Sequence, residues 1–167
     1  MLALIDADVL LYQLGSLSND EGHPLAWNLV TKRVDERIYD IMTGAGCDDY
    51  KLFLTGSNNF RIHEATILPY KGHRKQEKPY WHKDIKKYFM EGDKYKDKVD
   101  FSEDYEADDA LSIELRNDVA FLETIWNEDR LCEYGSWESY YEYYAMCVLC
   151  TIDKDLDMCP GKHAKWG

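Results

Sequence analysis

The stretch LALIDAD, residues 2–8, is a short apolar run that ends in two aspartates separated by an alanine. Continuous apolar runs of this length are typical of strands that are buried on both faces, as in parallel sheets. In open α/β sheets, ligands bind outside the carboxyl ends of the strands. The stretch therefore predicts a buried parallel strand that delivers Asp6 and Asp8 to the ligand-binding edge of a sheet.

Strand and helix patterns alternate along the rest of the chain. Apolar runs predict strands at residues 2–5, 50–54 and 146–152. Helical spacing of apolar residues is found at 9–14, 25–42, 80–90 and 105–116, with polar loops expected at 15–24 and 91–104. The segment 117–145 is an insertion rich in acids and aromatics, with Gly135 as the expected break between two helices. We predict one domain over residues 1–167, a three-layer α/β/α sandwich with a mainly parallel central sheet.

Three carboxylates fall within four residues in the stretch YEADDAL, residues 105–111. Glu106 and Asp109 are three residues apart and share a helix face, whereas Asp108 can lean toward a site beyond the helix end. Crowded carboxylates need nearby positive charge, and ligand sets made only of oxygen favour hard cations such as Mg²⁺ or Mn²⁺. The alternative is a helix N-terminus whose acids complement the helix dipole.

A third acidic group, Asp153 and Asp155, follows the predicted strand at residues 146–152. Each Asp-x-Asp pair could instead be a helix cap or a turn former. The three groups nevertheless occupy matching positions, at strand ends and at a helix start. We therefore expect them to converge on one edge of the sheet.

The charge of the chain is unevenly distributed. The formal net charge is −12, but residues 61–87 contain eight Lys or Arg and three Asp or Glu, a local balance of +5 that leaves −17 for the remainder. A basic segment on an acidic body is typical of an electrostatic contact with phosphate. A solvated amphipathic helix would give the same pattern.

The composition, with 45% hydrophobic and 14% aromatic residues, predicts a folded globular protein. No apolar run has the length of a membrane span, and no charged leader precedes a cleavable apolar segment. The five cysteines lack the spacing of a disulfide framework. Cys147 and Cys150 would face opposite sides of a strand, so we interpret them as buried apolar residues rather than metal ligands. We expect a soluble cytoplasmic protein.

Five motifs occur in the order found in a known enzyme family. They are IDAD at residues 5–8, TGSNNFR at 55–61, YKGHR at 70–74, EADD at 106–109 and TIDKDL at 151–156, followed by a Pro-Gly pair at 160–161. Over about residues 1–115 and 146–163, the chain resembles the phage 5′→3′ exonucleases of the flap endonuclease family, which are PIN-like in fold. The resemblance implies a nuclease that hydrolyses phosphodiester bonds of DNA, or of RNA, from or near a 5′ end in a phage-infected bacterial cell.

The resemblance also implies two Mg²⁺ ions, with Mn²⁺ as a substitute, that stabilise the attacking and leaving oxygens when water attacks in line. The residues that match the first ion's ligands are mainly Asp6, Glu106 and Asp108. The residues that complete this site and begin the second are Asp109, Asp153 and Asp155.

Four further residues match substrate contacts of the family. Lys71 and Arg74 would reach the scissile phosphate and neutralise charge in the transition state. Tyr70 would stack on a base, and Arg61 would contact backbone phosphate. Residues 69–90 would form an arch through which a single strand passes.

The chain departs from the family pattern in two places. Gly56 and Ser57 stand where relatives often have a carboxylate after the second strand, so one metal ligand is absent from the pattern. No stretch matches the helix–hairpin–helix module that grips duplex DNA in the family. We therefore expect a split product, a fragment or a minimal variant, with a protein partner that supplies this region.

Two other functions fit part of the pattern. A phosphatase of the haloacid dehalogenase type would use Asp6 as nucleophile, Asp8 as acid/base and Thr55 or Ser57 as its second motif. It leaves the EADD and YKGHR motifs without a role. A non-catalytic acidic binding subunit or DNA mimic would account for the acidic body and for the aromatic segment 117–145.

Overall fold

The computed structural model describes residues 1–56, 77–126 and 133–166. These residues contain a five-stranded sheet in which all strands are parallel, in the order β3-β2-β1-β4-β5. The strands are β1 (Leu2–Asp6), β2 (Asp49–Thr55), β3 (Val99–Ser102), β4 (Cys147–Cys150) and β5 (His163–Ala164). The α/β class and the parallel sheet are therefore confirmed.

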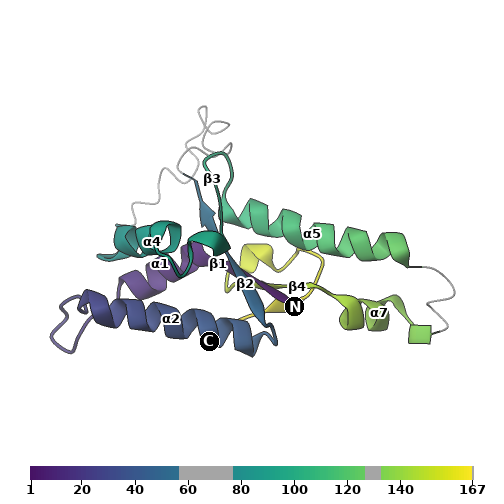
Figure 1. Ribbon diagram of the computed structural model, residues 1–167, viewed down its shortest axis with the longest axis horizontal. Coiled ribbons are helices and arrows are strands. Elements are labelled where there is room, and N and C mark those ends of the chain that lie inside the picture. The colour runs from purple at the N-terminus through teal and green to yellow at the C-terminus, as the bar shows by residue number, and fades with distance from the viewer. Residues whose placement is uncertain (57–76, 127–132, 167) are drawn as a thin grey trace.

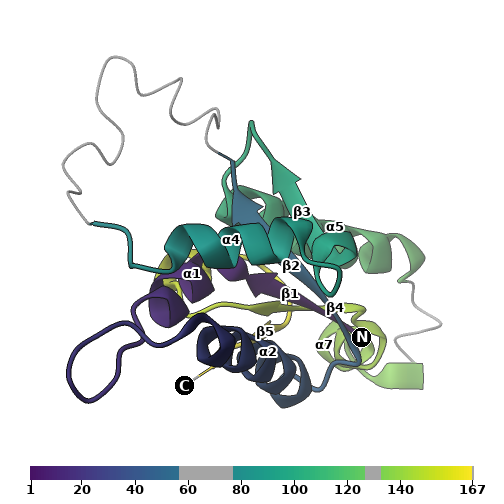
Figure 2. The same cartoon turned by 60° about the vertical axis from the view of Figure 1, so that its left-hand side comes forward.

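Helices cover both faces of this sheet, which gives three layers (Figures 1 and 2). One face carries α1 (Ala7–Gly15), α2 (Trp27–Gly44) and α4 (His82–Glu91), on the left in Figure 1. The other face carries α5 (Ala107–Ile125), and α7 (Trp137–Tyr144) lies below the C-terminal half of α5 in Figure 1. Two short 3₁₀ helices, η1 (Lys96–Lys98) and η2 (Lys154–Leu156), precede β3 and follow β4. No helix in the described part of the chain is long and apolar enough to cross a membrane.

The core follows the two-residue period of the strands. Ala3 and Ile5 of β1 pack with the helices α1, α2 and α4, whereas Leu4 between them packs with α5. The same alternation places Cys150 of β4 in the first cluster and Cys147 against the second. The two cysteines therefore lie on opposite faces, as predicted, and the four described cysteines are free.

Three parts of the fold differ from the sequence prediction. The polar segment 91–104 was predicted as a loop, but it contains η1 and β3, whose Val99 and Phe101 are half-buried against the core. The predicted turn after β4 ends in a two-residue strand, β5. The predicted helix 105–116 continues to Ile125, because Asp118 and Leu122 extend its buried stripe. Gly135, with a φ of +81°, lies just before α7 at the predicted break.

A carboxylate on α2 forms hydrogen bonds and an ion pair with side chains of α4 and of the segment that follows it. Asp35 accepts hydrogen bonds from the hydroxyls of Tyr88, at 3.0 Å, and Tyr95, and its other oxygen lies 3.3 Å from Nζ of Lys94. Burial, together with these bonds to Asp35, raises the pKa of Tyr88 to about 12 and also raises the pKa of Tyr95. The two tyrosines therefore remain hydrogen-bond donors at neutral pH and hold α4 against α2.

A buried carboxylate, Asp118 of α5, holds the beginning of β4. Its Oδ2 accepts the backbone N–H groups of Met146 at 3.2 Å and Cys147 at 3.3 Å. Burial raises the pKa of Asp118, while these two bonds lower it. An aromatic cluster that includes Trp126, Trp137 and the fully buried Tyr140 joins α7 to the end of α5.

We predict that Asp118→Ala lowers the free energy of unfolding by about 1–3 kcal/mol, because two backbone donors lose their acceptor. Asp118→Asn retains an acceptor oxygen and is expected to have a smaller effect. Urea unfolding of both variants measures the difference. Equal stability of Asp118→Ala and the wild type would contradict the proposed role of this carboxylate.

Candidate functional site

The sheet order places a topological switch point beside β1. The chain adds β2 and β3 on one side of β1 and then returns to add β4 and β5 on the other side. In open parallel sheets, the crevice at such a point, outside the carboxyl ends of the strands, is the usual ligand site. Asp6 is the last residue of β1, and Asp153 lies three residues after the end of β4. Two of the predicted acidic groups therefore flank this crevice.

The third acidic group begins α5 at the same edge. Glu106 is the N-cap residue of α5, and Asp108 and Asp109 lie in its first turn. One carboxylate oxygen from each of these three residues lies within 4.8 Å of the other two, and Glu106 is only 6% exposed. Among the described residues, this is the one group of three potential metal-binding side chains at such short range. Its oxygen-only composition suits Mg²⁺ or Mn²⁺.

Asp6 is nearly enclosed in protein, with 5% of its surface exposed. Burial raises its pKa to about 7. A hydrogen bond of 2.8 Å from the Thr151 hydroxyl opposes this shift, and the negative charges of Asp8 and Asp153 add to it. Asp6 therefore lies close enough to both neighbouring acids to feel their charges, although it is outside the group of three at the start of α5.

Asp8 is occupied by contacts with the end of β2. Its Oδ1 accepts the backbone N–H of Thr55 at 3.1 Å, and its Oδ2 accepts the Thr55 hydroxyl. Burial raises the pKa of Asp8, the two bonds from Thr55 and the charge of Lys86 lower it, and the charge of Asp108 raises it again. Asp8 thus joins the first turn of α1 to the end of β2 and lies near the α5 group.

Asp153 and Asp155 form a turn after β4. Asp153 is the N-cap residue of η2, and its Oδ1 accepts the backbone N–H of Asp155 at 2.9 Å. The backbone N–H of Asp153 in turn donates to the hydroxyl of buried Thr151 at 3.0 Å. The side chain of Asp155 is exposed. The structure therefore brings Asp153 toward Asp6 and places Asp155 at the rim.

Sequence reasoning assigned no role in this site to Thr151 or Lys86. Lys86 reaches the same edge from α4, where its Nζ donates to the backbone oxygen of Thr55 at 3.2 Å and lies 5.4 Å from the centre of the Phe101 ring. Thr55 directly follows the apolar run 50–54, whereas Thr151 lies inside the run 146–152, so no signal in the sequence related the two threonines. No signal distinguished Lys86 from Lys83 and Lys87 either.

The remaining predicted residues lie outside the described part of the chain. These are Arg61, Tyr70, Lys71 and Arg74, together with Ser57. Of the predicted arch, residues 77–90 are described, and most of them belong to α4.

Comparisons with protein-family models, curated proteins and solved structures gave no match.

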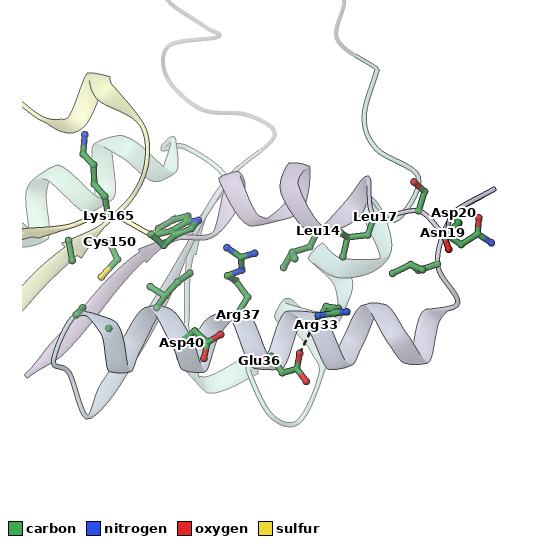
Figure 3. Close-up of a pocket in the computed structure, with 17 residues that line it drawn as sticks. Leu14, Leu17, Asn19, Asp20, Arg33, Glu36, Arg37, Asp40, Cys150 and Lys165 are labelled. Carbon is green, nitrogen blue, oxygen red and sulfur yellow. Dashed lines mark ion pairs between the residues drawn. The ribbon is translucent and has the colours of Figure 1, made fainter. Parts of the chain in front are cut away.

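A large groove lies elsewhere, between α1, α2 and the segment around β5 (Figure 3). It has a volume of about 810 Å³, and none of the described site acids lines it. Arg37 extends from α2 into this groove in Figure 3. Its charged lining consists of three basic and three acidic residues, Arg33, Arg37, Lys165, Asp20, Glu36 and Asp40. This balance gives the groove no preference for an anion.

We predict that the metal-free protein becomes less stable relative to Asp6→Asn as the pH rises from about 4 to 7. The pKa of Asp6 is raised from 3.8 to about 7, so the folded state binds the Asp6 proton more tightly than the unfolded state does. This proton stabilises the fold below about pH 4, and its contribution is lost as the pH rises through 7. The amide mimics the protonated carboxyl at every pH.

Thermal unfolding in EDTA from pH 4 to 8 measures this effect. The control is Asp97→Asn, in η1 before β3 and therefore toward the opposite edge of the sheet. If wild type and Asp6→Asn show parallel pH profiles, then Asp6 is ionised throughout this range.

Proposed function

We propose that this protein is a metal-dependent nuclease that hydrolyses phosphodiester bonds of DNA or RNA from or near a 5′ end. The observation that carries the proposal is the group formed by Glu106, Asp108 and Asp109 at the carboxyl edge of a parallel sheet. One carboxylate oxygen from each lies within 4.8 Å of the other two. Such a group is stable at neutral pH when a cation offsets its charge. The 5′ preference rests on the motif resemblance.

These three residues would hold one Mg²⁺, and Asp6, Asp153 and Asp155 would contribute to it and to a second ion. When bound, the metal ions would lower the pKa of water and stabilise charge on the phosphate oxygens. The enclosure of Asp6 keeps water away from one side of the site. Because burial raises the pKa of Asp6 to about 7, cation binding would release a proton from this carboxyl near neutral pH.

The surroundings of the site also suit a polyanionic substrate. The segment 61–87, with its balance of +5, follows β2 in the chain and includes the first part of α4. Lys86 brings an ammonium group to this edge, where its charge lowers the pKa of Asp8. Basic groups beside a metal site favour phosphodiesters because they bind the phosphate backbone without reading sequence.

Two alternatives give different products. The phosphatase hypothesis is compatible with the contact between Thr55 and Asp8, but it gives the Glu106 group no role. It predicts release of inorganic phosphate from a small phosphomonoester and no shortening of DNA. The non-catalytic hypothesis predicts binding to a partner without cleavage of any nucleic acid.

We predict Mg²⁺-dependent cleavage of 5′-tailed DNA by the wild type and none by Asp153→Asn. The amide keeps an oxygen that can accept the N–H of Asp155, and it removes one charge from the site. The melting temperature should therefore be equal to or higher than that of the wild type. Gel analysis of labelled DNA and RNA with a 5′ tail measures cleavage, with Asp97→Asn as the control. Wild-type cleavage by Asp153→Asn would remove Asp153 from the site.

We predict that Lys71→Ala lowers transition-state stabilisation by about 2–4 kcal/mol, by analogy with the removal of one preorganised donor. Single-turnover cleavage rates at saturating DNA measure this loss. Lys32→Ala, which changes a lysine of α2 that pairs with Glu36, is the control. Undiminished turnover in a Lys71→Ala, Arg74→Ala double variant would show that neither residue acts on the phosphate.

A further inference from the structure

Two threonines occupy equivalent positions on either side of β1. Thr55 is the last residue of β2, and Thr151 directly follows β4. β2 and β4 are the two strands that pair with β1. Each hydroxyl therefore lies where the chain leaves the sheet. One side of it faces Asp6, which ends β1, or Asp8, in the first turn of α1, and the other side faces an acidic group from another element.

The Thr55 hydroxyl connects α1 to the start of α5. It donates to Oδ2 of Asp8 and accepts the backbone N–H of Ala107 at 2.9 Å. Ala107 lies between Glu106 and Asp108 in the chain, so this bond fixes the backbone that carries two members of the acidic group. The neighbouring N–H of Gly56 donates to the backbone oxygen of Tyr105 at 3.2 Å and strengthens the same junction.

The Thr151 hydroxyl repeats this arrangement on the other side of β1. It donates to Oδ2 of Asp6 at 2.8 Å and accepts the backbone N–H of Asp153 at 3.0 Å. Thr151 is 2% exposed, so water cannot readily replace either partner. One buried hydroxyl thus sets the position of Asp6 relative to Asp153.

We propose that Thr55 and Thr151 are positioning residues that hold the three acidic groups in register for a shared divalent cation. The inference rests on the proposed metal centre and adds the two residues that position its carboxylates. A hydroxyl is suited to this role because it donates one hydrogen bond and accepts others at the same atom. A carboxylate in place of either threonine could only accept, and would add negative charge. Asp8, whose two oxygens are both bonded to Thr55, belongs to this support rather than to the ligands.

The test measures Mn²⁺ affinity by titration of the intact chain followed by electron paramagnetic resonance, at a temperature well below unfolding. Thr55→Val and Thr151→Val keep the size and branching of the side chain and remove the hydroxyl. Each is expected to weaken Mn²⁺ binding about 10–100-fold, the usual effect of removing a group that orients metal ligands. Thr55→Ser and Thr151→Ser keep the hydroxyl and should restore most of the affinity.

Two further measurements separate positioning from a general loss of stability. Thr43→Val is the matched control, because the Thr43 hydroxyl donates only to backbone oxygens within α2. Amide hydrogen exchange in the metal-free protein should become faster at Ala107 in Thr55→Val and at Asp153 in Thr151→Val. If a valine variant does not fold, the corresponding alanine variant, which adds no methyl group against the carboxylate, is measured instead.

The outcomes distinguish this inference from the proposed function. If the wild type binds Mn²⁺ and one valine variant binds it equally well, the threonine replaced in that variant has no positioning role. If both valine variants bind Mn²⁺ as well as the wild type does, the inference is overturned while the metal centre stands. If the wild type does not bind Mn²⁺, the metal centre itself is rejected and the positioning role with it. Weakened binding in valine variants that serine does not restore would assign the loss to packing and would overturn the inference.

Discussion

β1 pairs with a strand on each side and packs against helices on both faces, so residues 3–5 are completely buried. A strand in this environment has no freedom to shift its register, because a slip of one residue would exchange the side chains that face α5 with those that face α1 and α2. The position of Asp6 at its carboxyl end is fixed by the same packing. β2 and β4 run parallel to β1, and their carboxyl ends are therefore brought to the same edge. The acidic site is a direct consequence of how this strand is buried.

Burying acidic side chains at this edge costs free energy, and the raised pKa of Asp6 reflects that cost. Its pKa is raised to about 7 because a buried carboxylate loses hydration and feels the charges of Asp8 and Asp153. A hydrogen bond from Thr151 reduces this cost at Asp6 without cancelling it, and hydrogen bonds from Thr55 have the same effect on the raised pKa of Asp8. A site that remains unfavourable for negative charge in the absence of metal is well suited to binding a cation, since binding relieves repulsion that folding has created. Stability and affinity for the proposed cation would therefore be coupled through these carboxylates.

The sequence was informative where a single strong pattern determined the local structure. The apolar run before Asp6 predicted β1, and the clustered acids at 106–109 predicted a group that the structure brings within 4.8 Å. Prediction was poorer where tertiary contacts decided the outcome. β3 has only four residues and became a strand because β2 offers it hydrogen-bonding partners and the core covers Phe101. The contact of Lys86 with Thr55 was also unpredictable, because it depends on how α4 packs against α2 through Asp35.

Both edges of the sheet are short. β3, at one edge, has four residues, and β5, at the other, has two. A strand this short exposes few backbone N–H and C=O groups for pairing with another chain. Asp100 in β3 adds a charge that pairs with Lys51 on the neighbouring strand, and a charged edge further disfavours the approach of a second sheet. The described sheet is therefore protected against edge-to-edge aggregation, which allows its central strands to be as apolar as the core requires.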